Sequence, residues 1–189
     1  MDINVSDEQL VALIGNGDQH AFNQFLTRHI KKMMSFATRY TGKQHAEDIT
    51  QEVFTRLWTH AHQWKDQGLS PSSWLYRISY NLCIDHIRKQ HHISGDNVVE
   101  LHTAHHEEPE QQVIQSAEQV EVQRALKSLP ERQYTALILC TWQELSNKDA
   151  ANCMDVSVDA LESLLSRARR SLKKHLLQHK PDTKDVTYE

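Results

Sequence analysis

Glycine and proline are scarce in this chain, which has five glycines and four prolines among its 189 residues. An average protein carries about 12% of the two residues together. Because tight turns depend on them, their scarcity favours long helices and argues against a sandwich or barrel with many hairpins. No GxGxxG or GxxxxGK[ST] pattern is present, so the common glycine-rich nucleotide-binding signatures are excluded.

Cysteines and long apolar runs are scarce as well. The three cysteines, Cys83, Cys140 and Cys153, are widely spaced, which fits neither a disulfide framework nor a CxxC site. The longest apolar run, 136–140, is far shorter than the ~20 residues that span a bilayer. The polar beginning of the chain has no signal-peptide pattern. We therefore expect a soluble cytoplasmic protein.

The net charge of −4 conceals three stretches of opposite sign. Residues 26–43 carry basic side chains and no acidic one, residues 94–123 carry seven acidic side chains and no Lys or Arg, and residues 163–180 are again purely basic. Local stripes of charge, rather than the total, decide where a polyanion binds. The sequence therefore permits nucleic-acid binding at either basic stretch.

Apolar residues recur every three to four positions, which predicts helices almost throughout. We expect helices over 6–14, 18–41, 44–64 and 70–89 in the first part of the chain, and over 113–129, 146–154 and 157–178 in the second. A further helix restarts at Glu131 and is marked by Tyr134, Leu137 and Ile138. Ser6, Asp18, Ser146 and Ser157 are the expected N-caps, and Ser70-Pro71 is a further helix start.

The fold class that follows is all-α, with two small helical domains joined by a flexible acidic linker. The first domain is predicted at 1–90, the linker at 91–110, the second domain at 111–178 and a tail at 179–189. The linker contains Gly95, Pro109, five histidines and several acidic residues with weak periodicity, which is typical of an exposed connection.

The segment 146–178 has the proportions of a helix-turn-helix, with two capped helices and a short turn between them. On the second helix one side is apolar. Serine hydroxyls and then cations share the other side, at Ser163, Ser166, Arg167, Arg170 and Lys174. Short polar side chains near base edges and cations near phosphates suit a major-groove helix. A solvated amphipathic helix that closes a bundle would show the same charge pattern.

The second part of the chain contains three motifs, ALKSLPERQ (125–133), LSNKDAA (145–151) and LSRARRSL (165–172). They resemble region 4 of extracytoplasmic-function (ECF) sigma factors of the sigma-70 family, group 4. AEDITQEVF (46–54) is similar to the region 2 segment that binds core polymerase, and WLYRI (74–78) with IDHIR (84–88) is similar to the segment that reads and melts the −10 element. The motifs occur in the family's order and cover about 18–90 and 111–176.

The resemblance implies an alternative sigma factor that directs core RNA polymerase to −35/−10 promoters and initiates DNA melting. Contact with the clamp of the largest polymerase subunit is implied for Asp48, Gln51, Glu52 and Arg56. Leu57 and Trp58, on the same helix, are expected in the core instead. Region 4 would contact the flap of the second-largest subunit. An anti-sigma factor, cytoplasmic or at the inner membrane, is the implied regulator, and the free protein is expected to be a monomer.

Two sets of DNA-contacting residues are implied. Recognition and melting of the −10 element would use Trp64, Ser72, Ser73, Tyr76, Arg77, Tyr80, Arg88 and Lys89. Recognition of the −35 element would use Ser157, Ala160, Glu162, Ser163, Ser166, Arg167, Arg170 and Lys174. This chain departs from the common pattern at Asp155, where many relatives have Gly, and at Glu162, where Lys or Arg is common. Aspartate tolerates the left-handed conformation, so the turn can be kept. Glu162 could accept a hydrogen bond from a cytosine amino group or repel a phosphate.

No enzyme site stands out, since no triad, paired carboxylates or phosphate loop is present, and no cofactor or metal is expected. Two other readings stay open. The 13 histidines, including those at 60–62, 91–92 and 102–106, could make this a metal-binding helical protein, or a sigma factor whose linker senses metal. A plain helix-turn-helix repressor would explain 146–178 but would leave the segment 46–54 without a role.

Overall fold

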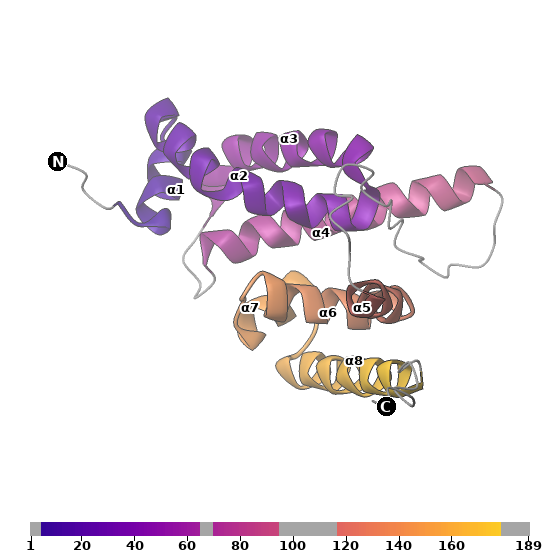
Figure 1. The fold of residues 1–189 in the computed structure, drawn as a ribbon. Helices are drawn as coiled ribbons and strands as arrows, with labels where there is room; N and C mark the ends of the chain where they lie inside the picture. Colours follow the sequence, from indigo (N-terminus) through magenta and orange to yellow (C-terminus); the bar gives the residue numbers. More distant parts are fainter. Residues whose placement is uncertain (1–4, 65–69, 95–116, 179–189) are drawn as a thin grey trace, which may run out of the picture.

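The structure is a computed structural model that describes residues 5–64, 70–94 and 117–178. Every regular element within these ranges is helical, which agrees with the all-α expectation. Residues 65–69, most of the predicted acidic linker and the predicted tail lie outside the described residues. Figure 1 shows two layers of helices, α1–α4 above and α5–α8 below. We call them the first half (5–94) and the second half (117–178).

The first half contains helices α1 (Asp7–Gly15), α2 (Gln19–Thr41), α3 (Lys43–His60) and α4 (Pro71–Ser94), with a short 3₁₀ turn at Ala61–Gln63. The two predicted caps are confirmed. The Ser6 hydroxyl accepts from the Gln9 amide at 3.3 Å, and the Asp18 carboxylate accepts from two amides at the start of α2. The helix expected over 44–64 ends four residues early because its last turn tightens to 3₁₀ geometry. α4 continues five residues beyond its predicted end at Lys89.

Aromatic and aliphatic side chains from α2, α3 and α4 form the core of the first half. Phe25, Phe36, Val53, Leu57 and Leu75 have no exposed side-chain surface. A fully buried side chain of this kind contributes roughly 1.5–3 kcal/mol to folding. The core fixes the three helices against one another, and so fixes which faces of α3 and α4 point outward.

The second half contains α5 (Ala117–Lys127), α6 (Glu131–Leu137), a π-helical turn (Ile138–Trp142), α7 (Asn147–Cys153) and α8 (Val158–Gln178). The sequence predicts an ordinary helix through Ile138, whereas in the structure α6 ends at Leu137 and a π turn begins at Ile138. The cap at Ser146 is confirmed by its hydroxyl, which accepts from the Asp149 amide at 3.1 Å. Asp155 has φ 53°, so the turn between α7 and α8 adopts the left-handed conformation predicted for it.

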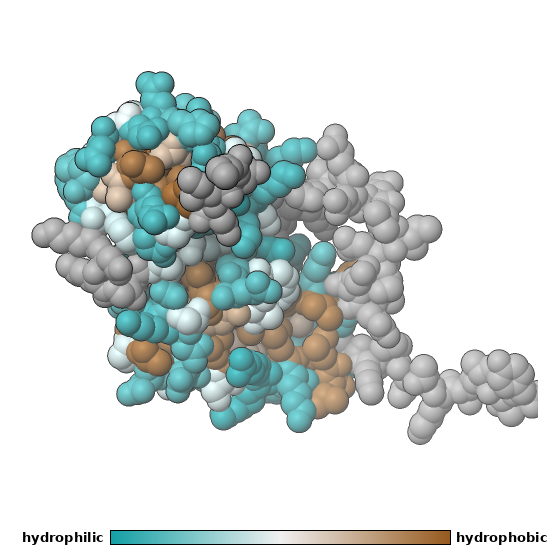
Figure 2. Space-filling model, turned by 90° about the vertical axis from the view of Figure 1, so that its left-hand side faces the viewer, coloured by the Kyte–Doolittle hydropathy of each residue, from teal (hydrophilic) through white to brown (hydrophobic). Residues whose placement is uncertain are grey.

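The face of the molecule shown in Figure 2 is mostly hydrophilic, with hydrophobic patches on both layers. Among the described residues, no helix is both long enough and apolar enough to cross a membrane.

Candidate functional site

One face of α8 is free and basic. Leu161, Leu165 and Ala168 are buried against α6 and α7, which orients the helix and turns its polar side outward. We call the outward set the basic face of α8; it consists of Ser163, Ser166, Arg167, Arg170 and Lys174, all exposed. The other three predicted −35 residues, Ser157, Ala160 and Glu162, are exposed as well. The eight predicted −35 residues thus lie on one accessible helix.

The start of α8 is held by two polar contacts. The Ser157 hydroxyl accepts from the Ala160 amide at 3.1 Å and caps the helix. The Asn147 side-chain amide, at the start of α7, donates to a carboxylate oxygen of Glu162 at 3.2 Å. Glu162 is therefore tied to the other helix of the helix-turn-helix, and its free oxygen remains available as an acceptor at the tip of the exposed face.

A groove of about 670 Å³ runs between α2 and α3. Its floor is apolar, and its rim includes the predicted polymerase contact Gln51 together with Glu47. Trp58 also lines it, stacked edge-on against Phe22 with ring centroids 5.2 Å apart. The expectation that Trp58 belongs to the core is wrong, because its side chain is 36% exposed on the groove wall, whereas Leu57 is fully buried as expected.

The remaining predicted polymerase contacts lie along the outer side of α3. Asp48 is exposed, and Glu52 is half-buried beside Arg56, which donates to its carboxylate at 2.7 Å. α3 therefore presents an apolar groove bordered by acidic and amide side chains, the kind of surface that a protein partner with basic and apolar side chains can cover.

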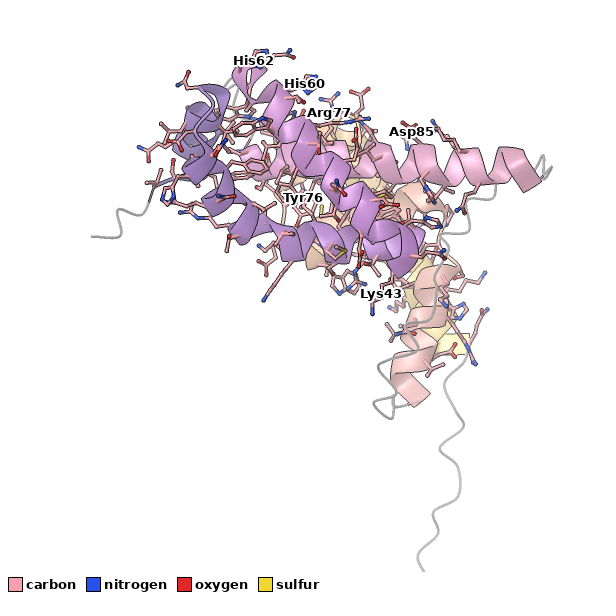
Figure 3. The ribbon with its side chains drawn as sticks, turned by 90° about the horizontal axis from the view of Figure 1, so that it is seen from above. Lys43, His60, His62, Tyr76, Arg77 and Asp85 are labelled. Atoms are coloured by element: carbon pink, nitrogen blue, oxygen red, sulfur yellow. The ribbon has the colours of Figure 1, made fainter. Side chains whose placement is uncertain are left out.

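The predicted −10 residues divide into exposed and covered sets. Arg77, Arg88 and Lys89 are exposed. Trp64, Ser72 and Tyr80 are half-buried. Ser73 and Tyr76 are only 2% exposed, because the second half packs on this side of α4. Figure 3 shows Tyr76 among the helices rather than at the surface.

Three tyrosine hydroxyls of the first half bond to the second half. Tyr40 donates to the Thr135 hydroxyl at 2.9 Å, Tyr80 donates to the Glu131 carboxylate at 2.7 Å, and Tyr76 donates to the Gln143 side-chain oxygen. Burial raises the pKa of Tyr76 and Tyr80, and for Tyr80 the negative charge of Glu131 raises it further. Both phenols therefore stay protonated and act as donors near neutral pH.

Further contacts close the same interface. The Cys153 thiol donates to the Ser73 carbonyl at 3.1 Å, and the Arg39 guanidinium lies 5.5 Å from the Trp142 ring centroid. Burial raises the pKa of the Cys153 thiol to about 12, so it is a poor nucleophile. Sequence reasoning missed Gln143, Thr135 and Trp142, since no local pattern marks residues whose partners are far away in the chain. We call Ser73, Tyr76 and Tyr80 the covered face of α4.

The histidine clusters give no metal centre among the described residues. No group of three or more His, Cys, Asp or Glu side chains there is arranged to hold a metal ion. The predicted clusters at 91–92 and 102–106 have no described side chains, so those alternatives remain predictions.

Comparison with known proteins assigns the family. Residues 25–93 match the family model for sigma-70 region 2, and residues 119–172 match the model for sigma-70 region 4. The chain is 32% identical over 154 residues to the ECF RNA polymerase sigma factor SigM of Bacillus subtilis, covering 77% of this chain and 88% of that protein. The chain belongs to the family of ECF RNA polymerase sigma factors.

Other relatives agree with that assignment. The ECF sigma factor SigE of Mycolicibacterium smegmatis is 30% identical to this sigma factor over 174 residues, covering 88% of this chain and 67% of SigE. The ECF sigma-E factor of Escherichia coli K12 is 27% identical and covers 91% of this chain and 95% of that protein.

Solved structures share the fold. CnrH in complex with the cytosolic domain of CnrY superposes with a TM-score of 0.67 at 23% identity, covering 92% of this chain and 99% of CnrH. The sigma factor RpoE of Bartonella quintana, solved with the anti-sigma factor NepR, also gives 0.67, at 24% identity, with 84% of this chain and 98% of RpoE covered.

Proposed function

We propose that this sigma factor binds core RNA polymerase through α2 and α3, directs it to −35/−10 promoters and starts DNA melting. The single observation that carries the proposal is the free basic face of α8 on a helix-turn-helix, in the same chain as an open groove at α3. A repressor would need the first feature but not the second. The bond-making chemistry belongs to the polymerase, so the sigma factor itself is not an enzyme.

We assign the functions of region 2 and region 4 to the two domains predicted from the sequence. Residues 1–90 act as region 2, residues 111–178 act as region 4, and residues 91–110 connect them. The polymerase clamp binds Gln51 at the rim of the α2–α3 groove together with Asp48, Glu52 and Arg56 on the outer side of α3. Region 4 binds the flap and places the basic face of α8 in the major groove of the −35 element. Joint attachment to polymerase raises the effective concentration of both DNA-binding regions.

The covered face of α4 requires the two halves to separate before the −10 element is read. Ser73, Tyr76 and Tyr80 reach a flipped base only when Gln143 and Glu131 have moved away. Single-stranded DNA binding needs stacking surfaces and nearby cations, which the tyrosines, Arg77 and Arg88 supply. Docking on polymerase favours the open form, because it places the halves on two different subunits.

An anti-sigma factor holds the protein inactive until a signal arrives. Support comes from the relative RpoE of Bartonella quintana, whose structure contains an anti-sigma factor. Such a partner would keep the sigma factor in the cytoplasm, either free or at the inner membrane.

The test is run-off transcription with purified sigma factor, core polymerase and a pool of genomic promoter fragments, followed by sequencing of the 5′ ends. We expect new start sites that share two spaced motifs. Absence of new starts together with failure to co-elute with core polymerase would contradict the proposal. A Gln51→Arg/Glu52→Arg variant adds a positive charge at the groove rim and reverses the charge of Glu52 on the outer side of α3, and it should lose co-elution. Thr59→Arg, exposed at the far end of α3, should keep it.

A further inference from the structure

Two histidines from different helices stack against each other on the first half. His45 lies near the start of α3 and His86 lies in α4, and their ring centroids are 4.4 Å apart with 45° between the planes. Both side chains are half-buried. The pair lies outside the helix-turn-helix and is separate from the histidines at 60–62, 91–92 and 102–106.

The Nε2 atoms of His45 and His86 both lie near the side-chain amide nitrogen of Gln90. The side-chain amide nitrogen of Gln90 lies 2.9 Å from Nε2 of His86 and 3.4 Å from Nε2 of His45. Because an amide nitrogen only donates, both Nε2 atoms accept there and each ring carries its proton on Nδ1. Two imidazole lone pairs therefore face the same donor, which is the electronic arrangement that a chelated cation requires.

Charged side chains of both signs lie around the pair. The electrostatic neighbours of His86 include the ammonium of Lys89 and the carboxylate of Asp48. Asp48 lies one helical turn after His45, on the same side of α3. A carboxylate at that distance can offset part of a cation's charge, although Lys89 acts against it.

We propose that His45 and His86 form a binding site for one divalent transition-metal cation of the kind that prefers imidazole, such as Zn²⁺ or Cu²⁺. The cation takes the place of the Gln90 amide nitrogen. Metal–nitrogen bonds of about 2.0–2.1 Å require each ring nitrogen to move roughly 1 Å closer than its present distance to that amide. Water completes the coordination, since no third His, Cys, Asp or Glu side chain among the described residues is arranged to join the pair. The site is independent of the proposed function in transcription.

The chain offers a matched control. His60 and His62 lie at the opposite end of α3 from Lys43, which marks the end that carries His45 (Figure 3). Both are exposed and close in sequence, but no contact joins their rings in the structure as the His45 and His86 rings are joined. A His60→Gln/His62→Gln variant removes as many imidazoles as His45→Gln/His86→Gln.

The first experiment is NMR of the full chain with ¹⁵N-labelled histidines during titration with substoichiometric Zn²⁺. We expect the Nε2 resonances of His45 and His86 to shift before those of any other histidine. Shifts that begin at histidines elsewhere in the chain, or that spread over all of them at once, would overturn the proposal.

The second experiment measures Zn²⁺ affinity by competition with a chromophoric chelator. The His45→Gln/His86→Gln variant should bind its tightest Zn²⁺ at least tenfold more weakly, while the His60→Gln/His62→Gln variant and Gln90→Ala should bind as the wild type does or better. Equal affinity in all variants would contradict the site. Circular dichroism melting of each variant shows that the fold is kept, and the single variants His45→Gln and His86→Gln should each weaken binding if the double variant is unstable.

Discussion

The two candidate DNA-binding surfaces of this sigma factor differ in accessibility. The side chains of the basic face of α8 are exposed, whereas on the covered face of α4 Ser73 and Tyr76 are 2% exposed. Both surfaces belong to amphipathic helices, so the difference does not come from the helices themselves. The difference in accessibility comes from α4, whose side facing the second half is apolar and rich in tyrosine. Helices α6 and α7 and the π turn can cover that side.

The basic face of α8 is accessible in the free protein, whereas the covered face of α4 becomes accessible only when the two halves separate. Charged side chains with flexible stems, as on α8, are costly to desolvate and stay in water. Tyrosines combine a large apolar ring with one donor, and they are satisfied equally well by a protein acceptor or by a nucleobase. The same chemistry that suits Tyr76 and Tyr80 to a flipped base also lets them bind Gln143 and Glu131.

The largest expected effect comes from removing positive charge from the basic face of α8. Arg167→Ala/Arg170→Ala removes two cations from the basic face of α8. A lost arginine contact to DNA costs about 1–3 kcal/mol, so we expect −35-dependent transcription to fall by at least tenfold. Run-off transcription on a promoter with and without its −35 element measures this.

The matched control for that variant is Arg169→Ala/Lys173→Ala. It removes the same charge from the same helix, from exposed positions nearer the buried stripe. It should reduce transcription far less. Equal losses in both variants would mean that α8 acts only through its overall charge.

The next effect comes from loosening the covered surface. Tyr76→Phe/Tyr80→Phe removes two hydrogen bonds between the halves at about 1 kcal/mol each, while both rings remain. Together about 2 kcal/mol is lost, so we expect the separated form to be ~30-fold more populated, seen as faster hydrogen exchange of the α7 amides. Thr55→Val, an exposed hydroxyl on α3, should leave that exchange unchanged; unchanged exchange in the tyrosine variant would contradict the role of these bonds.

A smaller effect concerns specificity at the tip of α8. Asn147→Ala removes the donor that holds Glu162. If Glu162 accepts from a cytosine, its release costs about 1 kcal/mol and relaxes preference at one −35 base pair, while Glu162→Gln changes which base is preferred. Selection of binding sites from randomised −35 elements measures both. An unchanged base preference in the two variants would assign Glu162 no part in readout.

The smallest expected effect is on folding stability and concerns Asp7, which lies away from both DNA-binding surfaces. Asp7 of α1 bonds His29 at 2.6 Å and Arg28 at 2.9 Å in α2, and the bond from His29 is the largest cause of its lowered pKa. A carboxyl whose pKa is lower in the folded state stabilises the fold above its unfolded pKa of about 4, and loses that contribution as pH falls through the folded value. Since the pair is partly exposed, we expect up to about 1 kcal/mol.

Urea unfolding of the wild type and Asp7→Asn from pH 7 to pH 3 checks this. The difference in the free energy of unfolding should be constant near neutral pH and shrink below about pH 4. A difference that grows on acidification would contradict the assignment.

Local patterns allowed much of the fold to be predicted. The caps at Ser6, Asp18 and Ser146 depend on side chains within three residues of the helix start, so the sequence contains all the information. The orientation of α8 follows from the spacing of Leu161, Leu165 and Ala168 in the same way. The π turn at 138–142 could not be predicted, because a single extra residue in a helical turn leaves no periodic mark.

The covered face of α4 lay beyond sequence reasoning for a different reason. Tyr40 and Thr135 are 95 residues apart, and Tyr80 and Glu131 are 51 apart, so no helical spacing relates them. Trp58 is expected in the core together with Leu57, but an aromatic residue beside an apolar stripe can equally line a groove. Predicting the burial of the α4 face and the position of Trp58 would both require knowledge of how distant helices pack.

The measurement that tests the central claim most directly is the distance between the two halves, free and on polymerase. Spin labels at Gln63→Cys and Ser171→Cys, both exposed positions, in a Cys140→Ser background report it by double electron–electron resonance. We predict one short distance for the free sigma factor and a clearly longer one in the complex with core polymerase. The same distance distribution in both states, with co-elution confirmed, would contradict an α4 face that is uncovered by docking.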